Sequence, residues 1–147
     1  MQQTKTDKNL QRAYFKCIEA ELFRYQATKQ ELHDLRMAII EGGGQPELPV
    51  YTGPGDTTGK KAVKLVTSVG IYEMERRVKA IEKALKEAER LEPGRMELVR
   101  LKYFDKKLTN YGIIKELNIS EATFYRWRRE LIYSIANKLG WDAGQEG

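Results

Sequence analysis

The sequence has only one cysteine, Cys17, and one histidine, His33, among its 147 residues. One thiol cannot form an internal disulfide, and these two side chains are too few ligands for a zinc site. Histidine-based catalytic triads also lack the residues that they need. We therefore expect no metal, no cofactor and no enzymatic activity, and we place Cys17 and His33 on helix surfaces.

Long apolar runs are absent too. The longest uncharged apolar stretches are far shorter than the roughly 20 residues that cross a bilayer, and the first five residues lack the apolar character of a signal peptide. Strand signals are scarce, because only residues 63–69 are rich in β-branched side chains and they do not alternate. These absences predict an all-α protein of a reducing compartment, without a membrane partner.

Charge is abundant. The chain has 26 lysines and arginines against 21 aspartates and glutamates, a net charge of +5. This basic excess is compatible with a polyanionic partner, although a helical protein can carry it without one.

Two segments that disfavour helices divide the chain. Residues 42–60 hold three consecutive glycines and three of the four prolines, so we expect a flexible loop there. At 91–94 a proline follows a long helical pattern and marks a boundary. We therefore expect a helical domain at 1–92, a second domain at 93–141 and a tail at 142–147.

The first domain has the pattern of a long, coiled-coil-like helical hairpin. Apolar residues at steps of three, four and seven predict one helix from about Asp7 to Glu41. The helix after the loop is charged, with pairs such as Glu82 and Lys86 at i and i+4, and its apolar residues form a coiled-coil seam. The seam residues are Ile71, Met74, Val78, Ile81 and Leu85.

A hairpin of two helices buries little surface by itself. Its seam therefore needs a partner, which is either a second copy of the chain or the C-terminal domain. We expect a homo-oligomer and favour a dimer.

The second domain has the pattern of a helix-turn-helix. After a helix that ends near residues 105–107, Thr109 is placed to cap a short helix, 118–120 form a turn, and Ser120 caps the next helix. Gly112 inside the short helix costs about 1 kcal/mol relative to alanine, and marks either close packing against the second helix or a weak helix. The expected core residues are Ile113, Leu117, Ile119, Phe124, Trp127 and Leu131.

The second helix of such a motif places its N-terminal turns in the major groove of double-stranded DNA. Side chains expected to contact base edges are Glu121, Ala122, Tyr125 and Arg126. Side chains expected to contact the DNA backbone are Thr109, Tyr111, Arg128, Arg129 and Lys138. The alternative is a solvent-exposed helix face with a buried tryptophan, which the caps, the turn and the apolar spacing disfavour.

Residues 91–104 and 113–139 resemble region four of bacterial sigma factors. More closely, 108–111, 118–131 (beginning Asn-Ile-Ser-Glu-Ala-Thr-Phe) and 138–141 are similar to the RinA/ArpU family of phage and prophage transcriptional regulators. The resemblance implies an activator of late phage genes in the cytoplasm of a bacterial host. It also implies that the four base-contacting residues read the promoter, and it admits host RNA polymerase as a further partner.

Two other functions stay open. A small DNA-recognition subunit of a phage packaging terminase also joins a helix-turn-helix to an oligomerising hairpin, but its DNA-binding part more often comes first in the chain. A sigma factor proper would need a further domain, and the hairpin has no evident aromatic cluster for melting a promoter. A ring of about eight or more subunits in solution would indicate the packaging subunit, and a monomer or dimer would indicate the activator.

Overall fold

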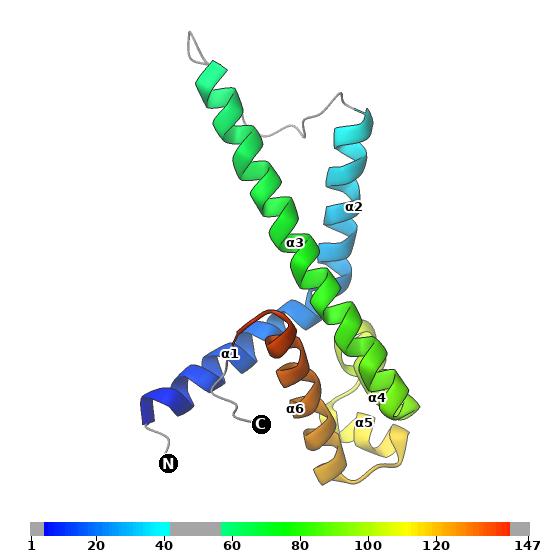
Figure 1. Cartoon of the computed structure of the whole chain (residues 1–147). Helices are drawn as coiled ribbons and strands as arrows, with labels where there is room; N and C mark the ends of the chain where they lie inside the picture. The colour runs from blue at the N-terminus through cyan, green and yellow to red at the C-terminus, as the bar shows by residue number, and fades with distance from the viewer. Residues whose placement is uncertain (1–4, 42–56, 142–147) are drawn as a thin grey trace. The chain divides into compact units, whose positions relative to one another are not determined.

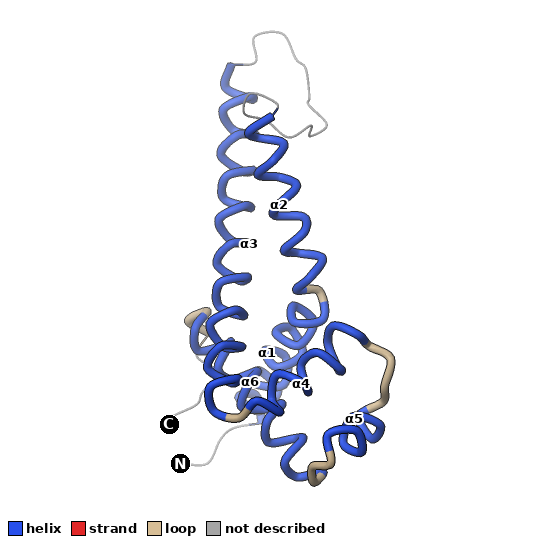
Figure 2. Tube along the Cα trace, turned by 90° about the vertical axis from the view of Figure 1, so that its right-hand side faces the viewer, coloured by secondary structure: helices blue, strands red, loops and turns tan. Residues whose placement is uncertain are grey.

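A computed structural model describes residues 5–41 and 57–141, with side chains described for 11–41 and 67–141. The described residues form helices joined by short turns, which confirms the expected all-α class (Figures 1 and 2). The elements are α1 (Lys5–Phe23), α2 (Tyr25–Glu41), α3 (Thr57–Leu91), α4 (Pro93–Val99), the π-helix η1 (Arg100–Asp105), α5 (Asn110–Leu117) and α6 (Glu121–Lys138).

Part of the segment expected to be a loop, 42–60, is helical. Residues 42–56 lie outside the described residues, as does the expected tail at 142–147. Residues 57–60, however, are the first turn of α3, so the expected loop was wrong there. No proline follows Pro54 in this stretch, and a helix of 35 residues tolerates the cost of about 1 kcal/mol that Gly59 brings.

The first long helix is interrupted, although the sequence predicted one continuous helix. α1 and α2 are separated at Arg24, whose N–H still donates to the carbonyl of Ala20 at 3.1 Å. The interruption is local, and the two helices bury their apolar residues in different compact units of the chain.

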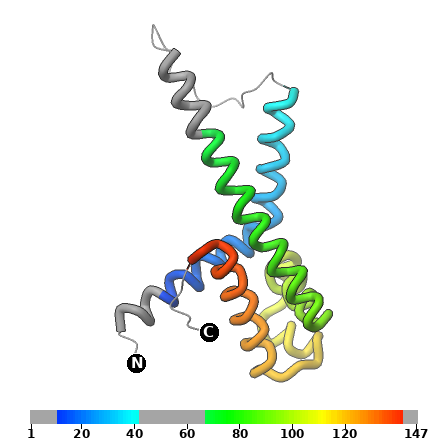
Figure 3. Tube along the Cα trace, in the orientation of Figure 1, coloured from blue at the N-terminus to red at the C-terminus, as the bar shows by residue number. Residues whose placement is uncertain are grey.

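The larger compact unit, unit 1, comprises residues 1–25 and 79–147. Within it α1 packs against α6 and η1, and Figure 3 shows this part of α1 passing beside the orange-red helix α6. Fully buried side chains from five elements form its core: Ile18, Leu22, Leu98, Val99, Tyr103, Ile113, Phe124, Ile132 and Ile135.

The smaller unit, unit 2, comprises residues 26–78, which include all of α2 after Tyr25 and the first part of α3. Leu32 of α2 and Val78 of α3 are buried, and Ile71 and Met74 are half-buried. An ion pair between Arg36 and Glu75, 2.6 Å long, joins the two helices of this unit.

These units do not follow the boundary expected at residue 92. α1 and the end of α3 belong to the same compact unit as residues 93–141. Consequently Ile81 and Leu85 of the seam are buried inside a single chain, at 3% and 8% exposure. This burial supplies the seam with an intramolecular partner, and the second copy that we expected stays a prediction.

The helix that leads into the helix-turn-helix has an unusual end. Pro93 begins α4 after the extended residue Glu92, and the chain continues as the π-helix η1. Lys106 ends it in the left-handed conformation (φ 58°), with its N–H donating to the carbonyl of Leu101 at 3.3 Å. No helix in the described residues is long and apolar enough to cross a bilayer.

Candidate nucleic-acid interface

The first helix of the helix-turn-helix, α5, begins as the sequence predicted. The hydroxyl of Thr109 accepts a hydrogen bond from the N–H of Gly112 at 3.1 Å, which satisfies one of the free donors of the first turn. The three atoms nearest to a Cβ on Gly112 would belong to Leu108 and Thr109, at 3.4 Å and beyond. None of these nearest atoms belongs to the second helix, so close packing against it, one of the two explanations offered for this glycine, stays a prediction without support here.

The turn between α5 and α6 is fixed by its backbone. Asn118 adopts the left-handed conformation (φ 53°), which asparagine tolerates better than most residues. The N–H of Ile119 then donates to the carbonyl of Ile114 at 3.2 Å. This closes the end of α5 in the manner of a helix C-cap and sets the direction in which α6 departs.

Ser120 caps α6, as predicted. Its hydroxyl oxygen accepts from the N–H of Thr123 at 3.0 Å and also donates to the hydroxyl of Thr123 at 2.8 Å. Glu121 follows in the first turn, where its negative charge complements the positive end of the helix dipole. The capped helix therefore starts at a defined position relative to α5.

One side of α6 holds it to unit 1. Phe124, Trp127 and Leu131 are buried, as is Ile113 of α5, whereas the other two expected core residues, Leu117 and Ile119, are half-buried. Four of the six expected core positions are thus buried and none is exposed.

Trp127 packs against the start of α4. A Cβ on Gly94 would lie 3.2 Å from Cη2 of the indole, so the ring and the backbone are in close contact. The guanidinium of Arg95 lies 5.5 Å from the ring centroid and pairs with Glu92 and Glu130 at 3.3 and 2.5 Å. The buried indole nitrogen has no hydrogen-bond partner in the described part of the chain. Trp127 is therefore a core residue among arginines.

The opposite side of the first turns of α6 faces solvent. All four residues expected to contact bases, together with Arg129, are exposed: Glu121, Ala122, Tyr125 and Arg126. Arg126 has only a long contact, 3.9 Å, with Glu130. Thr109 and Tyr111 at the start of α5 are exposed too, and the Lys115 ammonium lies 4.9 Å from the Tyr111 ring centroid. An exposed arginine with so weak a partner is available for a bidentate contact to guanine.

Comparison with protein families adds one result. Residues 62–136, just over half of the chain, match the family described as "Protein of unknown function (DUF1492)". The chain belongs to the DUF1492 family. The matched segment of this DUF1492 protein includes α4, η1, α5 and most of α6, but neither α1 nor α2. No curated protein and no solved structure matches the chain significantly.

Two cations of the DUF1492 protein that we expected on the DNA backbone have partners within unit 1. Arg128 donates from Nε and a terminal nitrogen to the carboxylate of Glu19 on α1, at 2.7 and 2.8 Å, and its guanidinium lies 4.9 Å from the Phe15 ring centroid. Lys138 donates to Glu87 on α3 at 2.7 Å. A DNA contact by either residue stays a prediction. The exposed residues at the start of α6 do not depend on these two cations.

Glu19 is the centre of a half-buried charged cluster that sequence analysis missed. The hydroxyl of Tyr103 also donates to its carboxylate, at 2.7 Å. Burial by itself raises the pKa of Glu19, but hydrogen bonds from Arg128 and Tyr103 and the charges of Arg128 and Lys102 outweigh it, so the pKa lies below its usual value. Burial and the bond to Glu19 raise the pKa of Tyr103. The cluster thus fixes α1 to the middle of α6.

Burial also lowers the pKa of Lys102, against the opposing effect of Glu19. Its ammonium donates to the side-chain carbonyl of Asn110 at 2.8 Å, which connects η1 to the start of α5. A signal for the docking of α1 was present in the sequence as aromatic residues beside the apolar stripe of α1. Each has an aromatic neighbour from later in the chain: Tyr14 with Trp141, Phe15 with Tyr133 and Phe23 with Tyr103.

His33 and Cys17 are exposed, as expected. In the described part of the chain no three histidine, cysteine or acidic side chains gather as metal ligands.

Proposed function

We propose that this protein is a sequence-specific, DNA-binding transcriptional regulator without enzymatic activity, and that α6 is its recognition helix. The observation that carries the proposal is the two-sided start of α6. Phe124 and Trp127 anchor the helix in unit 1, while Tyr125 and Arg126 between them are exposed. A recognition helix needs this division, because it must be held by its scaffold while its first turns enter the major groove.

The caps on both helices support the same proposal. Direct contacts to base edges require side chains held in a fixed position, and the hydrogen bonds of Thr109 and Ser120 define where α5 and α6 begin. Arg126 and Tyr125 are placed to contact base edges, and Arg129, one turn after Tyr125, is placed to contact phosphates.

The more specific part of the proposal is an activator of late phage or prophage genes, acting in the bacterial cytoplasm as a homodimer. It is supported by the resemblance of residues 91–141 to the RinA/ArpU family and to sigma region four. The family description itself assigns no function. A mass in solution of a monomer or dimer agrees with the activator, whereas a ring of about eight or more subunits would favour a packaging subunit instead.

Selection from a random duplex library tests the proposal. The full-length protein should enrich a common sequence of a few base pairs, and Arg126→Ala should bind the enriched duplex more weakly. The matched control is Arg12→Ala, because Arg12 is an exposed arginine on α1 outside the proposed interface. A wild-type protein that binds no duplex, or that binds every duplex equally, contradicts the proposal.

A further inference from the structure

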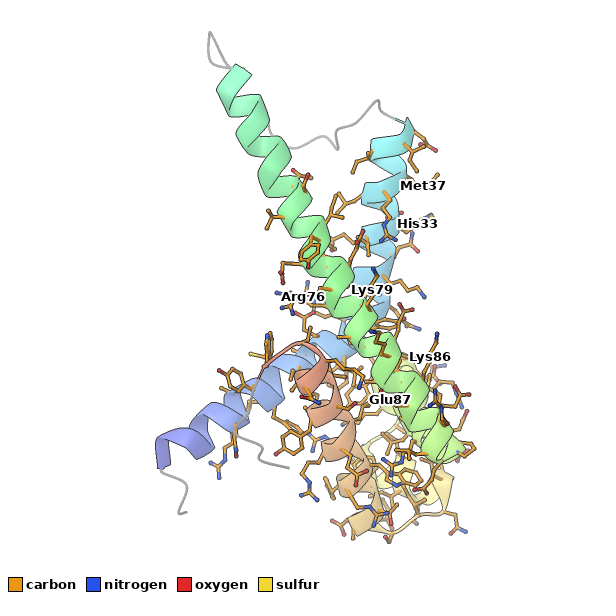
Figure 4. The ribbon with its side chains drawn as sticks, in the orientation of Figure 1. His33, Met37, Arg76, Lys79, Lys86 and Glu87 are labelled. Atoms are coloured by element: carbon orange, nitrogen blue, oxygen red, sulfur yellow. The ribbon has the colours of Figure 1, made fainter. Side chains whose placement is uncertain are left out.

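A row of four cations runs along the part of α3 that belongs to unit 1. Lys79, Lys83, Lys86 and Arg90 follow one another at steps of four, three and four, so they lie on one side of the helix. All four are exposed, and Figure 4 shows Lys79 and Lys86 on this stretch of α3. At 1.5 Å per residue, this basic row is about 16 Å long.

The basic row faces away from the core of unit 1. Each of its members stands five residues after a position of the apolar stripe, which is about 140° around the helix. On that stripe Ile81, Leu85 and Ala88 are buried. The row therefore lies on the solvent side of α3 and is not needed for packing.

Two of the carboxylates near the row, Glu82 and Glu87, bind other side chains. Glu82, which we expected to pair with Lys86, accepts a hydrogen bond from the hydroxyl of Tyr25 at 3.0 Å. Glu87 binds the ammonium of Lys138 at 2.7 Å. In the described part of the chain no member of the row forms an ion pair. The four cations thus stand in line and none of them is held by an ion pair, although the charge of Arg90 acts on nearby Glu87.

We propose that the basic row binds the phosphate backbone of DNA, as a second contact besides α6. A row of this length can contact more than one phosphate of a DNA strand at the same time. Three of its four members are lysines, whose compact ammonium groups bind phosphate as point charges without reading bases. The proposal rests on the proposed function, in which unit 1 binds DNA, and adds affinity that does not depend on sequence.

Salt dependence measures such a contact directly. The test compares wild type with Lys83→Gln/Lys86→Gln in the full-length protein, on a random-sequence duplex of about 40 base pairs, between ~50 and ~200 mM salt. The matched control, Arg12→Gln/Lys16→Gln, removes two exposed cations from α1, and neither is in the row or on α6. All four substituted positions are exposed, so both double variants should fold, and thermal melting checks that they do.

Losing two phosphate contacts should lower the slope of log K against log salt by about 1.8 and weaken binding about 20-fold near ~200 mM salt. The control variant should keep the wild-type slope. Base preference on an enriched duplex should be unchanged in the row variant. If the row variant has the salt slope and affinity of the control, the proposed phosphate contact of the basic row is overturned, whereas the proposed role of α6 is not affected. If the wild-type protein shows no base preference but the row variant still has a lower salt slope than wild type, the proposed function is overturned and the basic row is supported.

Discussion

Replacing Glu19 by alanine tests how strongly α1 is held to α6. The substitution removes the acceptor of three hydrogen bonds and leaves the guanidinium of Arg128 and the hydroxyl of Tyr103 unpaired. Removing one partner of a fully buried ion pair costs about 3–5 kcal/mol. Here the side chains of Glu19 and Arg128 are 15% and 23% exposed, so water reaches them. We therefore expect a loss of about 2–3 kcal/mol of unfolding free energy.

Thermal and urea unfolding of the full-length variants measure this loss. At about 2–4 °C per kcal/mol, the melting temperature of Glu19→Ala should fall by about 5–10 °C. Glu19→Gln keeps an oxygen acceptor without the charge and should lose less. Glu89→Ala, which removes an exposed glutamate from α3, is the control and should stay within about 0.5 kcal/mol of wild type. A Glu19→Ala protein as stable as Glu89→Ala would refute the role of this cluster.

The contribution of Glu19 to stability has a defined pH dependence. Because folding lowers the pKa of Glu19, its contribution is complete above the unfolded value, near 4.5, and is lost as the pH falls through the lower folded value. The stability difference between wild type and Glu19→Gln should therefore be constant at neutral pH and shrink below about pH 4.5. A difference that instead grows as the pH falls would show that the folded pKa is raised.

Further predictions concern packing in unit 1. Gly94→Ala should lose about 1–3 kcal/mol in urea unfolding, because the new Cβ would press on the Trp127 ring at 3.2 Å. Gly112→Ala should instead gain about 1 kcal/mol, since its Cβ has room; a loss would mean that α5 needs the glycine. Trp127→Ala should cost about 3–5 kcal/mol, and a variant that melts normally but loses DNA binding would place the ring on DNA. A fragment of residues 93–147 should bind hydrophobic dyes and lack a cooperative transition, because it lacks α1 and α3; a stably folded monomer would contradict this.

Local features of the fold could be predicted because they depend on neighbouring residues. The caps at Thr109 and Ser120 and the turn at Asn118 are determined within three or four positions of the chain. The buried side of α6 followed from the spacing of Phe124, Trp127 and Leu131.

Contacts between distant segments could not be predicted in this way. Glu19 and Arg128 are 109 residues apart, and Glu87 and Lys138 are 51 apart, so no periodicity relates them. Without these partners, Arg128 and Lys138 have the same pattern in the sequence as free cations on a DNA-binding helix. The compact units differ from the expected boundary for the same reason, because the apolar stripe of α1 indicates burial but does not identify the surface that covers it.

The measurement that tests the recognition helix most directly is competitive binding of the enriched duplex and its single-base variants to Arg126→Ala and Arg129→Ala. Arg126→Ala should lose about 1–3 kcal/mol on the enriched duplex and relax the preference at one base pair. Arg129→Ala should weaken binding to all duplexes alike and lower the salt slope by about one. Equal losses from both substitutions, independent of sequence, would contradict the assignment of Arg126 to base contact and of α6 to the major groove.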